Sequence, residues 1–280
     1  MSLTLSTAYV TLFDSEVKQA YQASSVLRDT VRLRSGVEGN TYKFPKIGKG
    51  SATLRVPQAD ITPLGVAHSQ VSVSMTDYSA GEYSDIFMQA KVNFDERREL
   101  VEVVSKAIGR RLDQMIIDAI DGAGTSLTVA NSIGGSNTNL NVDKLLKAKQ
   151  LMDTKNVPAE DRFILCHAKS MQGLLDEADV KSIDTNTVRV LATGSIDTFL
   201  GFKFITIGDR DEGGLAVDGS SDRTVLAWHK SSVGLAENMA QKTEINYIPE
   251  KASFLVNSMF SAGAVGIDAE GIVEITCRES

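Results

Sequence analysis

The chain has 280 residues, of which 42% are hydrophobic and 23% are charged, and its net charge is −7. These proportions are typical of a soluble, packed protein of one large or two modest domains, and they exclude a polyanion-binding role for the chain as a whole. Its two cysteines, Cys166 and Cys277, are too few for a disulfide framework. We favour two free thiols over a disulfide, as expected in a reducing compartment.

No stretch of the sequence has the length and apolarity of a membrane span. The first residues lack the basic and apolar blocks of a secretory signal. We therefore expect a protein that stays in the cytoplasm in which it is made and has no membrane partner.

The first predicted element is an amphipathic helix over residues 6–27, where apolar side chains recur at helical spacing. Extended chain follows from residue 31 to 73. Residues 41–44 and 52–56 alternate and predict a hairpin or a long loop, and residues 70–76 predict a strand. Between Arg28 and Arg55 lie seven basic and two acidic residues, so this segment carries +5 in an otherwise acidic chain. Such a segment is expected to meet an acidic surface on nucleic acid or on another protein.

The longest helical pattern runs from Phe94 to Gly124, with Asp95 as its predicted N-cap. Apolar residues at steps of three and four form one side. The opposite, solvent-facing side is predicted to carry the charged residues Glu99, Glu102, Lys106, Arg110 and Asp113. At 1.5 Å per residue the helix would be a rod of roughly 40 Å. Residues 82–94 are predicted to lead into it as extended chain.

Residues 125–140 are rich in Gly, Ser and Asn and predict a loop, and residues 141–230 predict a compact α/β unit. Within that unit we predict helices after Asn141, over 169–178 and over 230–236, strands over 162–167, 202–207 and 224–228, and a turn over 209–222. The remaining sequence predicts a strand over 243–248, a short helix over 254–260, and a pair of strands over 263–268 and 271–277.

No catalytic, cofactor-binding or metal-binding residues emerge from the motifs. The three histidines lack ligands at metal-site spacing, and no CxxC, HExxH or GxSxG motif occurs. Cys166 and His167 are adjacent on a predicted strand, so they point to opposite faces and cannot pair as nucleophile and base. Gly48–Ser51 lacks the first glycine of a phosphate loop, and the acidic group Asp209, Asp211 and Glu212 lacks the spaced ligands of a calcium loop. We therefore expect a structural or binding protein, not an enzyme, with no cofactor.

The order of these elements resembles that of the major capsid proteins of tailed bacteriophages. The stretches that carry the resemblance are the long helix with its lead-in Ile86–Phe94, and the segments Asn141–Leu175, Leu200–Asp209 and Ala227–Ile275. The resemblance implies an α+β fold shared with encapsulin shells. Its expected parts are an N-terminal arm (1–34), an extended β-hairpin loop region (35–80), a peripheral domain (81–130 and 241–280) with a spine helix (94–121), and an axial α/β domain (131–240).

The resemblance also implies self-assembly into pentamers and hexamers of an icosahedral head, built in the bacterial host cytoplasm. The head would enclose double-stranded DNA without sequence-specific binding. A separate scaffolding protein, a portal, and a decoration or cement protein are the other expected partners. Our hypothesis for the basic segment is that Lys43, Lys46, Lys49 and Arg55 contact acidic residues of an adjacent subunit. A solvated flexible loop is the alternative, and contact with the packaged DNA is disfavoured because the family places this loop on the outer shell.

Two other functions stay open at this point. An encapsulin-type shell that holds cargo would share the same fold. A cytoplasmic α/β enzyme or ligand-binding protein would place its site in residues 141–230, and it would need polar residues converging near strand ends.

Overall fold

The computed structural model describes residues 22–58, 60–61, 63–91, 95–177, 197–210, 212 and 214–279. The chain divides into two compact units. Unit 1 comprises Met1–Ser24, Asp77–Arg110 and Gln241–Phe260, and unit 2 comprises Ser25–Thr76, Arg111–Ala240 and Ser261–Ser280. Most of the helix predicted over 6–27 lies outside the described residues. Its last residues, 22–27, are not helical, so the prediction was wrong there.

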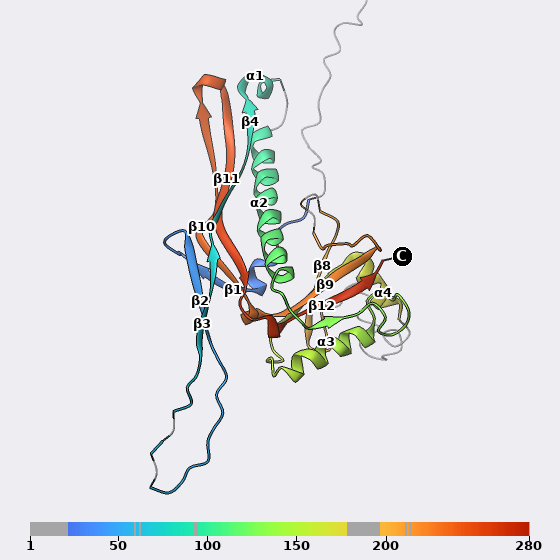
Figure 1. Cartoon of the computed structure of the whole chain (residues 1–280). Helices are drawn as coiled ribbons and strands as arrows, with labels where there is room; N and C mark the ends of the chain where they lie inside the picture. The colour runs from blue at the N-terminus through green and yellow to red at the C-terminus, as the bar shows by residue number, and fades with distance from the viewer. Residues whose placement is uncertain are drawn as a thin grey trace, which may run out of the picture. The chain divides into compact units, whose positions relative to one another are not determined.

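A six-stranded sheet forms the centre of unit 2 (Figure 1). Its order is β5 (Thr128–Val129), β12 (Ile272–Arg278), β9 (Asp222–His229), β6 (Arg162–His167), β8 (Phe202–Ile207) and β7 (Thr198–Phe199). Strand β6 pairs in parallel with β8 and antiparallel with β9, which in turn pairs antiparallel with β12. The strands predicted over 162–167, 202–207 and 224–228 are confirmed.

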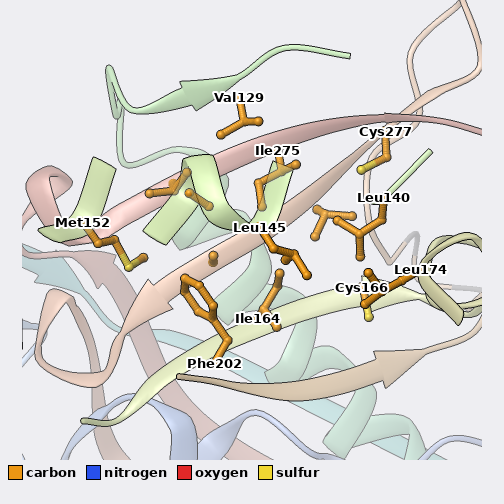
Figure 2. Packing of buried hydrophobic residues seen from close by; sticks show 14 of the residues in the cluster. Val129, Leu140, Leu145, Met152, Ile164, Cys166, Leu174, Phe202, Ile275 and Cys277 are labelled. Carbon is orange, nitrogen blue, oxygen red and sulfur yellow. The ribbon is translucent and has the colours of Figure 1, made fainter. Parts of the chain in front are cut away.

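The main apolar core of unit 2 lies between this sheet and two helices, α3 (Val142–Thr154) and α4 (Ala168–Asp176). Figure 2 shows Leu145, Ile164 and Phe202 converging from α3, β6 and β8, and all three are fully buried. Asn141 caps α3 as predicted, and its side chain accepts a hydrogen bond from the Lys144 amide at 2.8 Å. Both helices predicted in this region are therefore confirmed.

The basic segment folds as a two-stranded ribbon in which β2 (Thr41–Ile47) pairs antiparallel with β3 (His68–Ser74). The prediction that residues 52–56 pair with 41–44 was wrong, because residues 52–56 form no strand. Phe44 of β2 and Val73 of β3 are buried in one small cluster, whereas every side chain of 52–56 is exposed. Since burial fixes register, the distant strand is the partner. The long-loop alternative is correct for the described residues within 48–67, the segment that we call the arm loop.

A four-stranded sheet has the order β1 (Arg32–Ser35), β10 (Val233–Ile248), β11 (Ser253–Gly266), β4 (Thr76–Asp85). The short helix predicted over 254–260 was wrong, because these residues belong to β11. An apolar run of this length suits a strand or a helix equally well, and hydrogen bonding to neighbouring strands decides between them. The helix predicted over 230–236 is only the single 3₁₀ turn η3 (Lys230–Ser232). The last two predicted strands exist, but they join different sheets and do not pair with each other.

Helix α2 (Glu96–Asp121) has 26 residues and confirms the long helix. Its predicted apolar side is buried at Val104 and Ile108 in unit 1 and at Leu112, Ile116 and Ile120 in unit 2. Asp113 was predicted on the solvent side and is fully buried instead. Although α2 has the length of a membrane span, it is charged throughout, and no helix within the described ranges is apolar enough to cross a membrane.

The segment before α2 is not wholly extended. Residues 86–89 form the one-turn helix α1 (Ile86–Gln89), and 92–94 lie outside the described residues. Within unit 1, Tyr78 of β4 stacks on Phe260 of β11 with ring centroids 5.3 Å apart. Gln241 of β10 donates hydrogen bonds to the carbonyl and hydroxyl oxygens of Ser105 in α2, at 3.0 and 2.9 Å. Within unit 1, aromatic stacking thus joins β4 to β11, and polar contacts join β10 to the first half of α2.

Candidate functional site

The four basic residues predicted to contact another subunit all lie on the ribbon and the arm loop. Lys46 forms an ion pair with Asp268 at 2.9 Å, and Lys49 forms one with Glu270 at 2.6 Å. Lys43 and Arg55 are exposed. The structure therefore brings two of the four cations to acidic residues of the same chain and leaves two facing solvent.

The acidic partners belong to the tight turn η5 (Ala269–Gly271) between β11 and β12. The Glu270 carboxylate also forms an ion pair with Lys155 at 3.2 Å. Hydrogen bonds from Lys49 and Lys155 lower the pKa of this carboxyl. The same hydrogen bond raises the pKa of Lys49. Asp268 caps the turn by accepting the Glu270 amide at 3.1 Å. The turn is thus a preformed acidic receptor at the base of the arm loop.

The arm loop exposes large apolar side chains that the sequence analysis did not single out. Leu54 is 95% exposed and Ile61 is 93% exposed, and the group is completed by Val56 and Leu64 of the same loop and by Ile47 at the end of β2. Apolar side chains gathered on one exposed segment indicate contact with another molecule. The signal was in the sequence, because these residues interrupt an otherwise polar, Gly- and Pro-containing loop.

The chain just before the basic segment is held to α2 by the buried carboxylate of Asp113. This carboxylate accepts hydrogen bonds from the backbone amides of Val26 and Leu27 at 3.1 Å and from the hydroxyl of Ser25 at 2.8 Å. It also pairs with the buried guanidinium of Arg210 at 2.9 Å. We call residues 25–31 the arm root. Because Asp113 satisfies several donors at once, it fixes the position of the arm root against α2 within unit 2.

Two further contacts hold the arm root. Arg28 donates two hydrogen bonds of 2.7 Å to the carboxylate of Glu237, and this interaction raises the pKa of the guanidinium. The indole of Trp228 donates to the carbonyl of Thr30 at 3.1 Å. No local sequence pattern could have identified these partners, because about two hundred residues separate the members of each pair.

The buried titratable groups of unit 2 have structural partners. Lys144 donates to the carbonyls of Thr138 and Thr276 at 2.6 and 2.9 Å, and burial lowers its pKa. His167 lies 3.2 Å from Glu279, which also accepts a 2.7 Å hydrogen bond from Arg223. Such pairing stabilises the end of the last strand.

The thiols are equally inert. Burial raises the pKa of Cys166 to about 11 and that of Cys277 to about 12, and both lie inside the core in Figure 2. A buried thiol with so high a pKa is a poor nucleophile at neutral pH. The part of the chain that the structure describes contains no group of three or more His, Cys, Asp or Glu residues placed to hold a metal ion.

The comparison with protein families decides the identity. The profile of the family described as "Phage capsid protein" matches residues 5–279. The chain belongs to the phage capsid protein family. It is therefore a structural major capsid protein, a component of a phage head that associates with copies of itself into a shell. No curated protein matches the capsid protein in sequence.

Solved phage structures share the fold of this capsid protein at low sequence identity. The capsid structure of cyanophage P-SCSP1u aligns over 100% of this chain and 96% of its own, with a TM-score of 0.79 and 16% identity. The head structure of Helicobacter pylori bacteriophage KHP40 aligns over 97% and 96%, with a TM-score of 0.79 and 11% identity. A structure of Mycobacterium phage Che8 aligns over 95% of this chain and 96% of its own, with a TM-score of 0.75 and 16% identity.

These matches confirm the α+β capsid fold and the resemblance drawn from the sequence. The family has a structural role, as expected for a chain without catalytic motifs. The matches give no support to the alternatives of an encapsulin-type shell or of an α/β enzyme with a site in residues 141–230.

Proposed function

We propose that this capsid protein forms the pentamers and hexamers of an icosahedral head that encloses double-stranded DNA, and that its arm loop is a principal subunit contact. The observation that carries the proposal is the nearly complete exposure of Leu54 and Ile61 on a long extended loop. Burying each side chain on a neighbour would contribute about 1.5–3 kcal/mol. A shell repeats that contribution at every subunit.

The charges of the arm loop support the same proposal. The segment from Arg28 to Arg55 has seven basic and two acidic residues, although the whole chain has a net charge of −7. An arm of this sign would be attracted to the acidic remainder of an adjacent copy. We propose that Lys43 and Arg55 reach that copy directly, and that Lys46 and Lys49 lie at the same contact while their own acidic turn sets the arm's direction.

We further propose the domain division that the family resemblance implies. The N-terminal arm would span 1–34, the extended loop region 35–80, the peripheral domain 81–130 and 241–280, and the axial domain 131–240. Continuous helical structure over 96–121 supports the spine helix, and the α/β pattern of 141–229 supports the axial domain.

The remaining proposals concern partners and place of assembly. A separate scaffolding protein, a portal, and a decoration or cement protein would act with the shell, which would be assembled in the host cytoplasm. Contact with DNA would be weak and independent of sequence, because an acidic subunit makes few phosphate contacts.

The test is expression of the chain alone and with candidate scaffolding proteins, followed by size-exclusion chromatography and negative-stain electron microscopy. Closed shells or capsomer-sized rings are expected. The double change Leu54→Ser and Ile61→Ser should abolish them while leaving the isolated subunit folded. Leu146→Ser, at an exposed apolar position of α3, is the matched control and should assemble normally. A monomer under every condition, scaffold included, would refute the shell proposal, and unchanged assembly of the double variant would refute the role of the arm loop.

A further inference from the structure

A second group of exposed apolar side chains lies in unit 1, at the one-turn helix α1. Phe87 is 68% exposed and Met88 is 58% exposed, and Tyr83 and Ile86 beside them are also exposed. Asp85 stabilises this turn, because its carboxylate accepts hydrogen bonds from the backbone amides of Phe87 and Met88 at 2.7 and 3.2 Å. A capped turn that presents an aromatic side chain outward is a preorganised anchor for another protein surface.

A small cavity lies next to this anchor in the same unit. Its volume is about 130 Å³, and it is lined by Ser84, Ile86, Gln89, Arg97 and Phe254. The Arg97 guanidinium lies over the ring of Phe254 at 4.7 Å. Glu96 links two more residues of the lining, Ser84 and Gln89. Its carboxylate accepts a hydrogen bond of 2.8 Å from the Ser84 hydroxyl, and its backbone amide donates one of 3.1 Å to the side-chain oxygen of Gln89. The cavity is therefore held open by its own contacts. Its volume is close to the ~150 Å³ of an engineered cavity that takes a benzene molecule.

The side chain of Phe87 does not fill the cavity of its own copy. Phe87 directly follows a residue that lines the cavity, and its side chain points to solvent, since it remains mostly exposed. We propose that Phe87 of one subunit occupies the unit 1 cavity of a second copy of this chain. Such a contact joins two different surfaces, and it forms a ring if the rotation that repeats it closes. The proposal rests on the assembly of the chain into shells.

The charges around the contact match this occupant. Glu82 is exposed on β4 beside the anchor. The side chain of Arg97, at the cavity, is 38% exposed and forms a 3.6 Å ion pair with the exposed Asp95 of the same copy, which leaves its remaining donors for a second carboxylate. Insertion of Phe87 would bring the Glu82 carboxylate of one copy toward the Arg97 guanidinium of the next. Opposite charges at the rim of an aromatic anchor give an interface its orientation.

The size of the contact indicates that it acts within a shell. An aromatic anchor with its apolar neighbours buries on the order of a few hundred Å², whereas a stable pair needs about 1,200–2,000 Å². The contact alone would not hold two free subunits together. It would add to contacts that other surfaces make, and it would select the arrangement in which units 1 of neighbouring copies meet.

The first experiment compares shell formation by the wild-type chain, Phe87→Ser, and the control Leu146→Ser at a series of subunit concentrations. For Phe87→Ser we expect the concentration at half-assembly to rise about tenfold or more. The melting temperature of the unassembled subunit should stay unchanged. Equal assembly of Phe87→Ser and wild type would overturn the proposal. If the wild-type chain forms no shells under any condition, the proposed function itself fails, so the two failures are distinguishable.

A charge exchange provides a second test that does not depend on the anchor variant folding. Glu82→Arg and Arg97→Glu should each weaken assembly, and the double variant, which restores opposite charges across the contact, should recover it. Recovery would support the contact. Normal assembly of the single variants would overturn the proposed contact. A double variant whose assembly defect equals the sum of the two single defects would also overturn it.

Discussion

Replacement of Asp113 with alanine should lower the free energy of unfolding of the unassembled subunit by about 3–5 kcal/mol, the usual cost of removing one partner of a buried ion pair. The carboxylate is fully buried and accepts hydrogen bonds from Ser25, Val26 and Leu27 as well as from Arg210. Most of the cost arises at Arg210, whose buried guanidinium would lose its counter-charge. The Ser25 hydroxyl and the Val26 amide are only partly buried and can turn to water, whereas the Leu27 amide is buried and would add to the cost.

The variant Asp113→Asn keeps the shape of the side chain and removes its charge. The amide keeps one accepting oxygen for the arm root but removes the negative charge from Arg210. A hydrogen bond to a charged group contributes about 1.5–3 kcal/mol, so the asparagine variant should lose roughly that much, less than the alanine variant. The order of stability should therefore be wild type, then Asn, then Ala.

The assay is urea unfolding followed by the fluorescence of Trp228, the single tryptophan of the chain. Its indole is buried and hydrogen-bonded to the carbonyl of Thr30 in the arm root, so it reports on the segment that Asp113 holds. Asp113→Ala combined with Arg210→Leu should cost less than the sum of the single changes, with a coupling of at least about 1 kcal/mol. The reasoning is refuted if Asp113→Ala costs under 1 kcal/mol or if the two changes are additive.

Three further predictions concern other parts of unit 2. Gly263→Ala should lower the free energy of unfolding of the subunit in urea by about 1–3 kcal/mol, because a Cβ there would overlap the backbone of β3. The control Gly208→Ala places its Cβ in open space and should stay within about 0.5 kcal/mol of wild type. With a pKa of about 11, the thiol of Cys166 should react with a disulfide reagent at pH 8 at least about 200-fold more slowly than free cysteine. Rapid labelling of Cys166 in the folded subunit would contradict its burial. Because Lys49 lowers the pKa of Glu270, their contact should protect the amides at the base of the arm loop from hydrogen exchange above pH 4.5. This protection should be lost as the pH falls below that value, and Glu270→Gln should abolish the dependence on pH.

The sequence by itself determined the elements whose residues carry a local signal. The spacing of Val104, Ile108 and Leu112 defines α2, and the side chain of Asn141 marks the start of α3, because a helix is specified by side chains within a few residues of each other. The order of such elements was enough to indicate a capsid fold. The cluster of basic residues in the arm was visible for the same reason, since charge is a property of composition.

The tertiary structure decided what depends on residues distant in the chain. The apolar run 254–260 suits a helix or a strand, and only pairing with neighbouring strands makes it β11. The partner of β2 lies at 68–74 because those residues share a buried face with it. Asp113 has the polarity of a surface residue and lies buried, because donors about ninety residues away converge on its carboxylate. Local spacing determines which face of an element is apolar, and the long-range fold determines what that face meets.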